Sequence, residues 1–160
     1  MTVHLWRIGT DTVDYTDDDK SGAGAKITGG RWNRKGEALL YTATSVALAC
    51  LETIVHLAGG DLPLNRYLVR LDIPEAVWQQ ARIITARTAP VGWDAIPTGK
   101  VSLDLGRQWL TDTSAPALLC VPSVIVPEEQ NVLINPAHPD VANIAVIKLR
   151  KWTYDVRVWA

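Results

Sequence analysis

The stretch Tyr67-Leu-Val-Arg-Leu-Asp-Ile73 decides the fold class, because its apolar and polar side chains mostly alternate with a period of two. This alternation predicts a β-strand, and Pro74 ends it. Other short runs of apolar residues, bounded by Pro, Asn or charged residues, predict further strands. These runs are residues 3–8, 38–42, 117–121, 124–126, 132–134, 145–149 and 152–159.

Two segments predict helices. Residues 45–58 follow a Thr44/Ser45 start signal and precede a Gly59-Gly60 stop signal. Residues 100–111 carry apolar side chains at helical spacing. Many strands with few intervening helices predict an α+β fold, a single mixed domain over residues 1–160, rather than a doubly wound sheet.

The segment 11–30 is rich in Asp and Gly, and it therefore has little apolar surface to bury. We expect it to form one long loop. Loops of this length within a small domain usually have a function or are partly disordered.

Composition narrows the class of protein. Of the 160 residues, 48% are hydrophobic and 21% are charged, which favours a globular core. The net charge of -1 argues against DNA binding through phosphate neutralisation alone. No apolar run approaches the roughly 18 residues of a membrane span, and Met1–Ile8 has no signal-type apolar core, so we expect a cytoplasmic protein. The two cysteines, Cys50 and Cys120, are too few for a disulfide scaffold or a four-thiolate zinc site.

Glu52 lies in the largely apolar helical segment 45–58, which contains no Lys or Arg to pair with it. An unpaired buried carboxylate is costly, so a buried Glu52 needs a partner from elsewhere in the chain. One interpretation places Glu52 on a narrow solvent face with Thr53 and His56. The other places its carboxylate in a cleft.

The run Gly29-Gly30-Arg31-Trp32-Asn33-Arg34 allows a tight turn followed by an arginine. A guanidinium binds phosphate groups well, which favours a phosphate-containing ligand. The alternative is an ordinary glycine turn with a solvated Arg31 and a core Trp32. Tyr41 likewise either stacks on a planar ligand, with its hydroxyl reaching a ribose, or packs in the core.

Ser123 lies between apolar runs and lacks the flanking glycines of a nucleophile elbow. A buried hydroxyl bonded to backbone is the simple interpretation. His138 and Asp140 are neighbours in sequence, but a Ser-His-Asp triad has little support. We expect no metal site, because Glu52 and His56 have no second histidine at metal-binding spacing.

In combination these segments resemble the RES domain family, named for an Arg, a Glu and a Ser. The resemblance extends from about Trp6 to Trp152. The matching segments are Gly29-Gly30-Arg31-Trp32-Asn33, Tyr41 with Ala43 and Ser45, Ala49-Cys50-Leu51-Glu52, Val121-Pro122-Ser123, and Pro127-Glu128-Glu129 with Asn131 leading to Asn135-Pro136.

The resemblance implies a largely antiparallel sheet core similar to that of ADP-ribosyltransferases, and NAD as a substrate rather than as a permanently bound cofactor. It implies the toxin of a type II toxin–antitoxin system that cleaves the nicotinamide–ribose bond of NAD by phosphorolysis or hydrolysis. The first alternative is an ADP-ribosyltransferase that modifies a cellular protein. The second is a non-catalytic module that binds a phosphorylated ligand or a partner.

The resemblance also implies site residues. Glu52 would stabilise the positive charge that develops on the anomeric carbon, Arg31 would hold the phosphates or ribose and keep Glu52 ionised, and Tyr41 would stack on the nicotinamide. Ser123 would contact the ribose or amide. The remaining substrate-binding residues would be Gly30, Trp32 and Asn33.

Partners follow from the same resemblance. The expected partner is an antitoxin of the Xre type, a helix-turn-helix protein. DNA contacts would belong to that antitoxin and not to this near-neutral chain. A homodimer is a further expectation, and membrane association is not expected.

Overall fold

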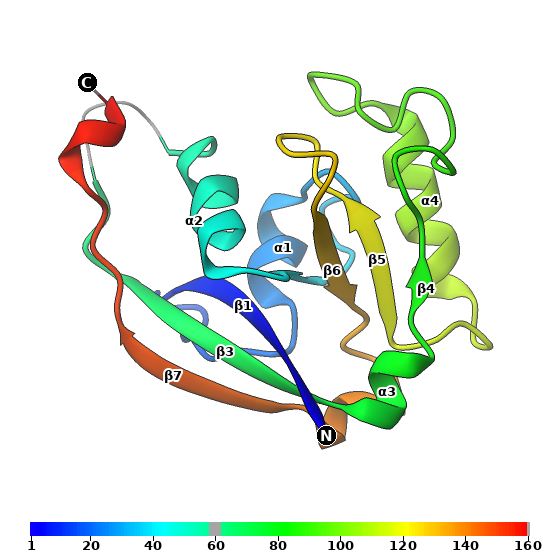
Figure 1. Ribbon diagram of the computed structural model, residues 1–160, viewed down its shortest axis with the longest axis horizontal. Coiled ribbons are helices and arrows are strands. Elements are labelled where there is room, and N and C mark those ends of the chain that lie inside the picture. Colours follow the sequence, from blue (N-terminus) through cyan, green and yellow to red (C-terminus); the bar gives the residue numbers. More distant parts are fainter. Residues whose placement is uncertain (58–61, 160) are drawn as a thin grey trace.

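Residues 1–57 and 62–159, the part of the chain that the computed structural model describes, build a seven-stranded sheet in the order β4-β5-β6-β2-β1-β3-β7 (Figure 1). The strands are β1 (Thr2–Thr10), β2 (Leu40–Ala43), β3 (Arg66–Pro74), β4 (Arg82–Ile83), β5 (Leu118–Pro122), β6 (Gln130–Ile134) and β7 (Ala145–Lys151). The helices are α1 (Ala23–Thr28), α2 (Val46–Ile54), α3 (Glu75–Gln79) and α4 (Lys100–Thr111), with 3-10 turns η1 (Pro139–Asn143) and η2 (Val156–Trp159).

The sheet is largely antiparallel, since every neighbouring pair of strands except β4 and β5 runs antiparallel. This confirms the predicted α+β class with a largely antiparallel sheet core. Hydrogen bonding is uneven across the sheet. All nine residues of β1 pair with β3, whereas its register with β2 is a single pair, Trp6 opposite Ala43. Far fewer paired residues therefore join β1 to β2 than join β1 to β3.

The predicted strand 67–73 is confirmed within β3, and its burial explains the alternation. Val69, Leu71 and Ile73 are completely buried in one cluster, while Leu68 points into another cluster on the opposite face. Arg70 and Asp72 remain partly exposed. This central strand thus contributes to the core on both faces of the sheet.

Helix α2 packs against β1 and β2 through Leu48 and Ala49, which contact Ile8 and Ala43 in one buried cluster. The predicted start is confirmed, because the Ser45 side chain accepts a hydrogen bond from the Leu48 amide. The helix ends at Ile54, before the predicted limit. The Gly59-Gly60 stop signal lies outside the described residues. Helix α4 has the predicted bounds, 100–111, and it buries Trp109 against β5 and β6.

Three expectations about secondary structure are wrong, and short-range hydrogen bonds explain each difference. Residues 124–126 form a turn because the Ser123 hydroxyl accepts the Ile125 and Val126 amides. The tail 152–159 is not a strand: its last residues form η2, where Asp155 accepts the Arg157 amide.

The third wrong expectation concerns the segment 11–30, which is not a continuous loop because it contains α1. The carboxylate of Asp19 accepts the Ala23 amide at the start of this short helix. Gly22 precedes it with a φ of 75°, a left-handed conformation that glycine adopts without strain. The Asp-rich part is also attached to the sheet, since Lys148 on β7 contacts the buried carboxylate of Asp17 at 2.8 Å.

Candidate functional site

A cavity of about 960 Å³ lies where β1, β2, the segment around α1 and helix α2 meet. Its size is in the range of small-molecule and cofactor sites. Five of the seven predicted site residues line it: Gly30, Arg31, Trp32, Tyr41 and Glu52. Ser123 and Asn33 do not line it and lie just behind its wall, completely buried.

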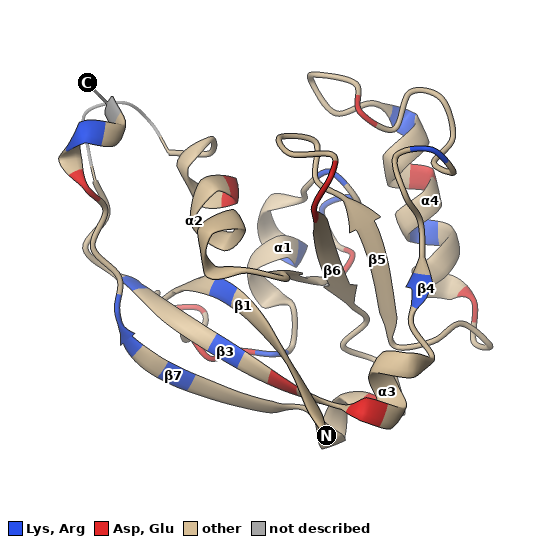
Figure 2. Cartoon of the chain, in the orientation of Figure 1, with Lys and Arg blue, Asp and Glu red and all other residues tan. Residues whose placement is uncertain are grey.

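Glu52 is the one charged residue of α2, and Figure 2 shows an acidic band on an otherwise uncharged helix. The side chain is half-buried in the cavity wall. Its partner is Ser123, whose Oγ donates a hydrogen bond of 2.6 Å to Glu52 Oε1. A carboxylate in a cavity, held by a residue from elsewhere in the chain, favours the cleft interpretation over the solvent-face one.

Ser123 is completely buried and bonded to backbone, as the simple interpretation of the sequence predicted, and it also contacts Glu52. Its hydroxyl donates to Glu52 and accepts the backbone amides of Ile125 and Val126 at 3.1 and 3.2 Å. The single hydroxyl proton is thus directed to Glu52, and both lone pairs are occupied. In this structure Ser123 positions the carboxylate, and its hydroxyl has no capacity left for a ribose or amide.

Arg31 lies in the cavity wall, where its Nη1 donates to the carbonyl oxygens of Trp93 and Ala95 at 3.1 and 2.9 Å. Burial lowers the pKa of Arg31, while the negative charges of Glu52 and Asp94 raise it in part. Among the described residues Arg31 and Glu52 form no direct ion pair, so the two charges act on each other through space. The remaining N–H groups of Arg31 are available to a ligand.

Tyr41 fixes the glycine turn. Its hydroxyl donates to Asn33 Oδ1 at 2.6 Å and accepts the Trp32 amide at 3.0 Å. Burial holds the pKa of Tyr41 well above its usual range. Because the only hydroxyl proton is used, the expected contact from this hydroxyl to a ribose is limited to accepting one further hydrogen bond. The ring itself lines the cavity.

The hydrogen bonds of the Tyr41 hydroxyl require a glycine at position 30, since a Cβ there would lie 2.7 Å from the Tyr41 hydroxyl oxygen. Asn33 is completely buried, and its amide nitrogen donates to the carbonyl oxygens of Ala25 and Glu37. Trp32 is 2% exposed and stacks on Trp93 with ring centroids 6.2 Å apart. The Asn33 amide and the Trp32 ring therefore shape the loop that presents Arg31, and Trp32 also lines the cavity.

Sequence reasoning missed several groups of this site. The carbonyl groups that hold Arg31 belong to the backbone of residues 93 and 95, and backbone groups have no sequence signal. Arg7 also lines the cavity, from β1. A signal for it existed, because Arg7 interrupts an apolar strand between Trp6 and Ile8.

Other candidate chemistry finds no place in this site. His138 Nδ1 accepts the Asp140 amide at the start of η1, and no serine of the described residues is hydrogen-bonded to it. Within residues 1–57 and 62–159, no three His, Cys, Asp or Glu side chains are grouped as a metal site would require. The helices of the described part are all too short or too polar to cross a membrane.

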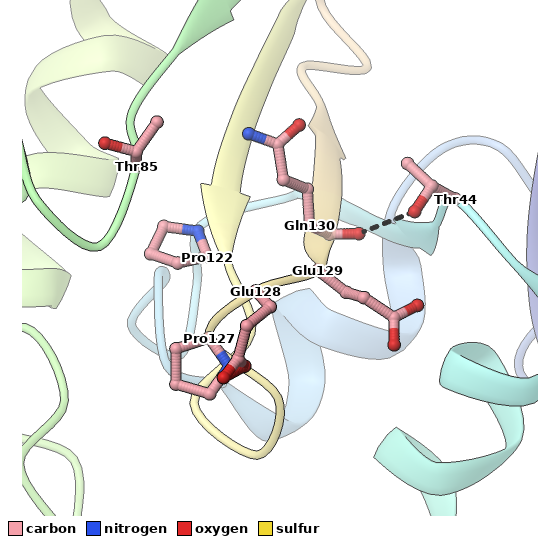
Figure 3. Close-up of a pocket in the computed structure, with 7 residues that line it drawn as sticks. All are labelled: Thr44, Thr85, Pro122, Pro127, Glu128, Glu129 and Gln130. Carbon is pink, nitrogen blue, oxygen red and sulfur yellow. Dashed lines mark hydrogen bonds between the residues drawn. The ribbon is translucent and has the colours of Figure 1, made fainter.

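A second, smaller pocket of about 330 Å³ lies beside the beginning of β6 (Figure 3). Its wall consists of Thr44, Thr85, Pro122, Pro127, Glu128, Glu129 and Gln130. The Thr44 hydroxyl donates to the Gln130 carbonyl oxygen across it. None of the predicted site residues lines this pocket, so the larger cavity is the candidate site.

Three known proteins are similar to this chain over most of its length. The curated "Prs ADP-ribosylating toxin" of Sphingobium sp. (strain YBL2) is 59% identical over 158 residues, 99% of this chain and 98% of that protein. The protein "Toxin Res" of Pseudomonas putida is 38% identical over 97% of this chain and 99% of its own length. A second "Toxin Res", from Photorhabdus laumondii, is 40% identical over 79% of this chain and 78% of its own.

Solved structures share the fold. A chain in the crystal structure of the M. tuberculosis MbcT–MbcA toxin–antitoxin complex matches with a TM-score of 0.61, over 99% of this chain and 87% of that one. At 14% identity this similarity concerns the fold alone. The model of the RES domain matches residues 4–157, almost the full sequence. With this match and the identities above, the chain belongs to the RES domain family.

Proposed function

We propose that this protein is the toxin of a toxin–antitoxin pair, and that it cleaves the nicotinamide–ribose bond of NAD and transfers ADP-ribose to a protein. The observation that carries the proposal is the position of the Glu52 carboxylate. It lines the same cavity as Arg31, and the buried Ser123 hydroxyl holds it there with a hydrogen bond. The name of the 59% identical relative supports this activity.

The chemistry requires a fixed negative charge. When the bond from the anomeric carbon to the nicotinamide nitrogen breaks, its electron pair leaves with nicotinamide and the ribose becomes cationic. A carboxylate already fixed in place stabilises that charge more in the transition state than in the ground state. Nicotinamide departs as a neutral molecule, so no general acid is required. The acceptor then forms the new bond and loses a proton, for which Glu52 is the nearby base.

The other cavity residues orient the substrate. Arg31 directs its free N–H groups to the phosphates or ribose, and the Tyr41 ring stacks on the nicotinamide. Gly30, Trp32 and Asn33 hold the loop in the shape that places these two side chains. Ser123 acts through Glu52.

The proposed acceptor is a Prs protein, because the relative's name gives Prs as its target. Transfer to water or phosphate is a second candidate. It shares the first bond cleavage, and a cavity of about 960 Å³ has room for a small acceptor beside a bound nicotinamide nucleotide.

We also propose a protein partner, an Xre-type helix-turn-helix antitoxin, and a homodimer as the form of the toxin itself. The structural similarity to a chain of a toxin–antitoxin complex supports the antitoxin. The formal net charge of -1 is consistent with leaving DNA contacts to that partner.

One incubation tests the proposed function. Purified protein is mixed with NAD labelled in its adenylate half, with and without a Prs protein and with and without phosphate. We expect free nicotinamide and label retained on Prs. The variant Glu52→Gln keeps the shape and removes the charge, so its rate should fall about a hundredfold or more while its melting temperature stays close to that of the wild type.

The products separate the alternatives. Label on free ADP-ribose alone indicates hydrolysis, and a phosphorylated product formed only with phosphate indicates phosphorolysis. Failure of the wild-type protein to release nicotinamide would support a non-catalytic binding module. An unaltered rate in Glu52→Gln would end the assignment of Glu52.

A further inference from the structure

Helix α2 is anchored unevenly along its length. Its buried residues, Leu48 and Ala49, both lie in the first half of the helix and pack against the sheet. The second half, which carries Glu52, is only partly buried. In the last turn the Val55 amide lies 3.4 Å from the Leu51 carbonyl oxygen, near the outer limit of a hydrogen bond. The end of α2 that carries Glu52 is therefore held less firmly by core packing and backbone bonds.

The tail that follows β7 contacts this end of the helix. It runs beside the start of β3, where the Trp152 amide donates to the Arg66 carbonyl oxygen at 2.9 Å (Figure 1). Two residues later the Tyr154 hydroxyl lies 2.7 Å from Thr53 Oγ1, in the last turn of α2. Tyr154 is 5% exposed, although its neighbours in sequence are exposed. Its ring therefore points inward from an exposed tail.

A second hydrogen bond fixes the direction of the bond between Tyr154 and Thr53. The Thr53 hydroxyl donates to the Cys50 carbonyl oxygen of its own helix at 2.7 Å. A threonine hydroxyl has a single proton, so Tyr154 is the donor and Thr53 Oγ1 is the acceptor. The two bonds together connect the tail to the backbone of the turn that contains Glu52.

Trp152 fixes the place from which Tyr154 reaches α2. Its ring packs against the buried cluster that includes Leu48 and Ala49. The Arg150 guanidinium lies over the ring, 4.8 Å from its centroid. The rings of Trp152 and Tyr154 meet edge to face, with centroids 6.4 Å apart. The two rings therefore form one packed unit between the sheet and α2.

Glu52 is thus held from two directions. Ser123, which follows β5, bonds its carboxylate, and Tyr154, which follows β7, bonds the helical turn that carries it. In the sheet order, β5 and β7 lie on opposite sides of the join between β1 and β2, which is the single pair Trp6–Ala43. Helix α2 packs across this join. The two bonds therefore fix Glu52 relative to both parts of the sheet.

We propose that Tyr154 is a positioning residue of this site, which acts through Thr53 to fix the end of α2 and so the place of the Glu52 carboxylate. This inference rests on the proposed function for the role of Glu52. Among the described residues that line the cavity Tyr154 is not present, so it acts through the helix and not on the substrate. A misplacement of about 1 Å at a reacting group can lower a rate on the order of a hundredfold.

Steady-state kinetics of nicotinamide release test the proposal. Tyr154→Phe keeps the ring and removes only the donor to Thr53. We expect kcat to fall about tenfold, with KM for NAD and the affinity for ADP-ribose within about twofold of the wild type, because the groups that bind substrate are unchanged. The assay temperature is one at which melting curves show both proteins folded. The matched control is Tyr67→Phe, on β3 and outside the cavity wall, which should keep the wild-type kcat. An unchanged kcat in Tyr154→Phe, or a loss confined to KM, would overturn the proposal.

Thr53 supplies a second arm of the test. Thr53→Val keeps the shape of the side chain but removes the acceptor, so kcat should fall at least as much as in Tyr154→Phe. Thr53→Ser keeps the hydroxyl and should retain nearly the wild-type kcat. The double variant of Thr53→Val and Tyr154→Phe should lose no more than Thr53→Val alone, because both changes remove the same bond. Losses that add in full would show that the two residues act separately and would overturn the proposal.

Amide hydrogen exchange keeps this inference apart from the proposed function. In Tyr154→Phe the amides of the last turn of α2 should exchange about tenfold faster, and those of α4 should be unchanged. If the wild type releases no nicotinamide, the proposed function fails, while faster exchange in α2 still shows that Tyr154 positions the end of the helix that carries Glu52. If the wild type releases nicotinamide and Tyr154→Phe alters neither kcat nor exchange, this inference fails alone.

Discussion

At the scale of single residues, the site depends on hydrogen bonds behind the cavity wall as much as on the groups that line it. Ser123→Ala removes the donor to Glu52 and takes away the hydroxyl that accepts the Ile125 and Val126 amides. We expect kcat to fall about ten- to a hundredfold with KM nearly unchanged, and stability to fall by about 1–3 kcal/mol. Steady-state kinetics and urea unfolding measure both effects.

Ser114→Ala is the matched control, because Ser114 also donates to a carboxylate, that of Asp112, but neither residue lines the cavity. It should leave kcat unaltered. Full activity in Ser123→Ala would show that Glu52 needs no positioning.

Variants of Tyr41 test separately what its ring and its hydroxyl contribute to stability and activity. Tyr41→Phe keeps the ring in the cavity but removes the group that joins Asn33 to the Trp32 amide. We expect a loss of stability of about 1–2 kcal/mol and a smaller loss of activity than in Tyr41→Ala, which loses the ring as well. Thermal melting and nicotinamide release test this. Equal activity of the Phe and Ala variants would remove the ring from the proposed stacking role.

At the scale of elements, Gly106 of α4 packs against the backbone of Trp32, in the loop that carries Arg31. A Cβ at Gly106 would collide with the carbonyl oxygen of Trp32. In an isolated helix, Gly→Ala stabilises by about 1 kcal/mol, but here the backbone of the loop has to move, and overpacking costs about 1–3 kcal/mol. We expect Gly106→Ala to be destabilising overall and to lower NAD cleavage, since Arg31 is the neighbour of Trp32. A higher melting temperature would contradict this.

The elements predictable from sequence are those whose signals are local. The Ser45 cap defines the start of α2, and apolar spacing defines α4. The 124–126 turn was missed because apolar residues there resemble a strand, while one buried hydroxyl determines the backbone path. In the site, the residue types were recognisable, but the bond between Glu52 and Ser123 joins positions 71 apart and has no local pattern.

At the scale of the whole molecule, hydrogen bonds between polar side chains join parts of the chain that are distant in sequence. Asp72 on β3 receives two hydrogen bonds from Arg70 and lies 2.8 Å from His4 Nδ1 on β1. Glu37, in the segment before β2, lies 2.7 Å from Arg107 Nε on α4. Figure 2 shows basic bands along β3 and β7, with an acidic band near the end of β3.

These pairs make the fold sensitive to acid. Hydrogen bonds from Arg70 hold the pKa of Asp72 below its usual range. Burial raises the pKa of Glu37, but Arg107 and the Arg34 amide outweigh it and lower the pKa overall. A carboxyl group with a lower pKa in the folded state stabilises the fold above its unfolded pKa of about 4, and this contribution is lost as pH falls through the folded value.

We therefore expect the urea midpoint to change little between pH 7 and 5 on account of Asp72 and Glu37, and to fall below about pH 4. Asp72→Asn should lower the midpoint at pH 7 and reduce the fall in acid, because the variant has no proton to take up at that position. Glu128→Gln is the control, as Glu128 is exposed and forms no ion pair among the described residues. The same acid dependence in Asp72→Asn as in the wild type would show that the Arg70–Asp72–His4 cluster does not hold β1 and β3 together.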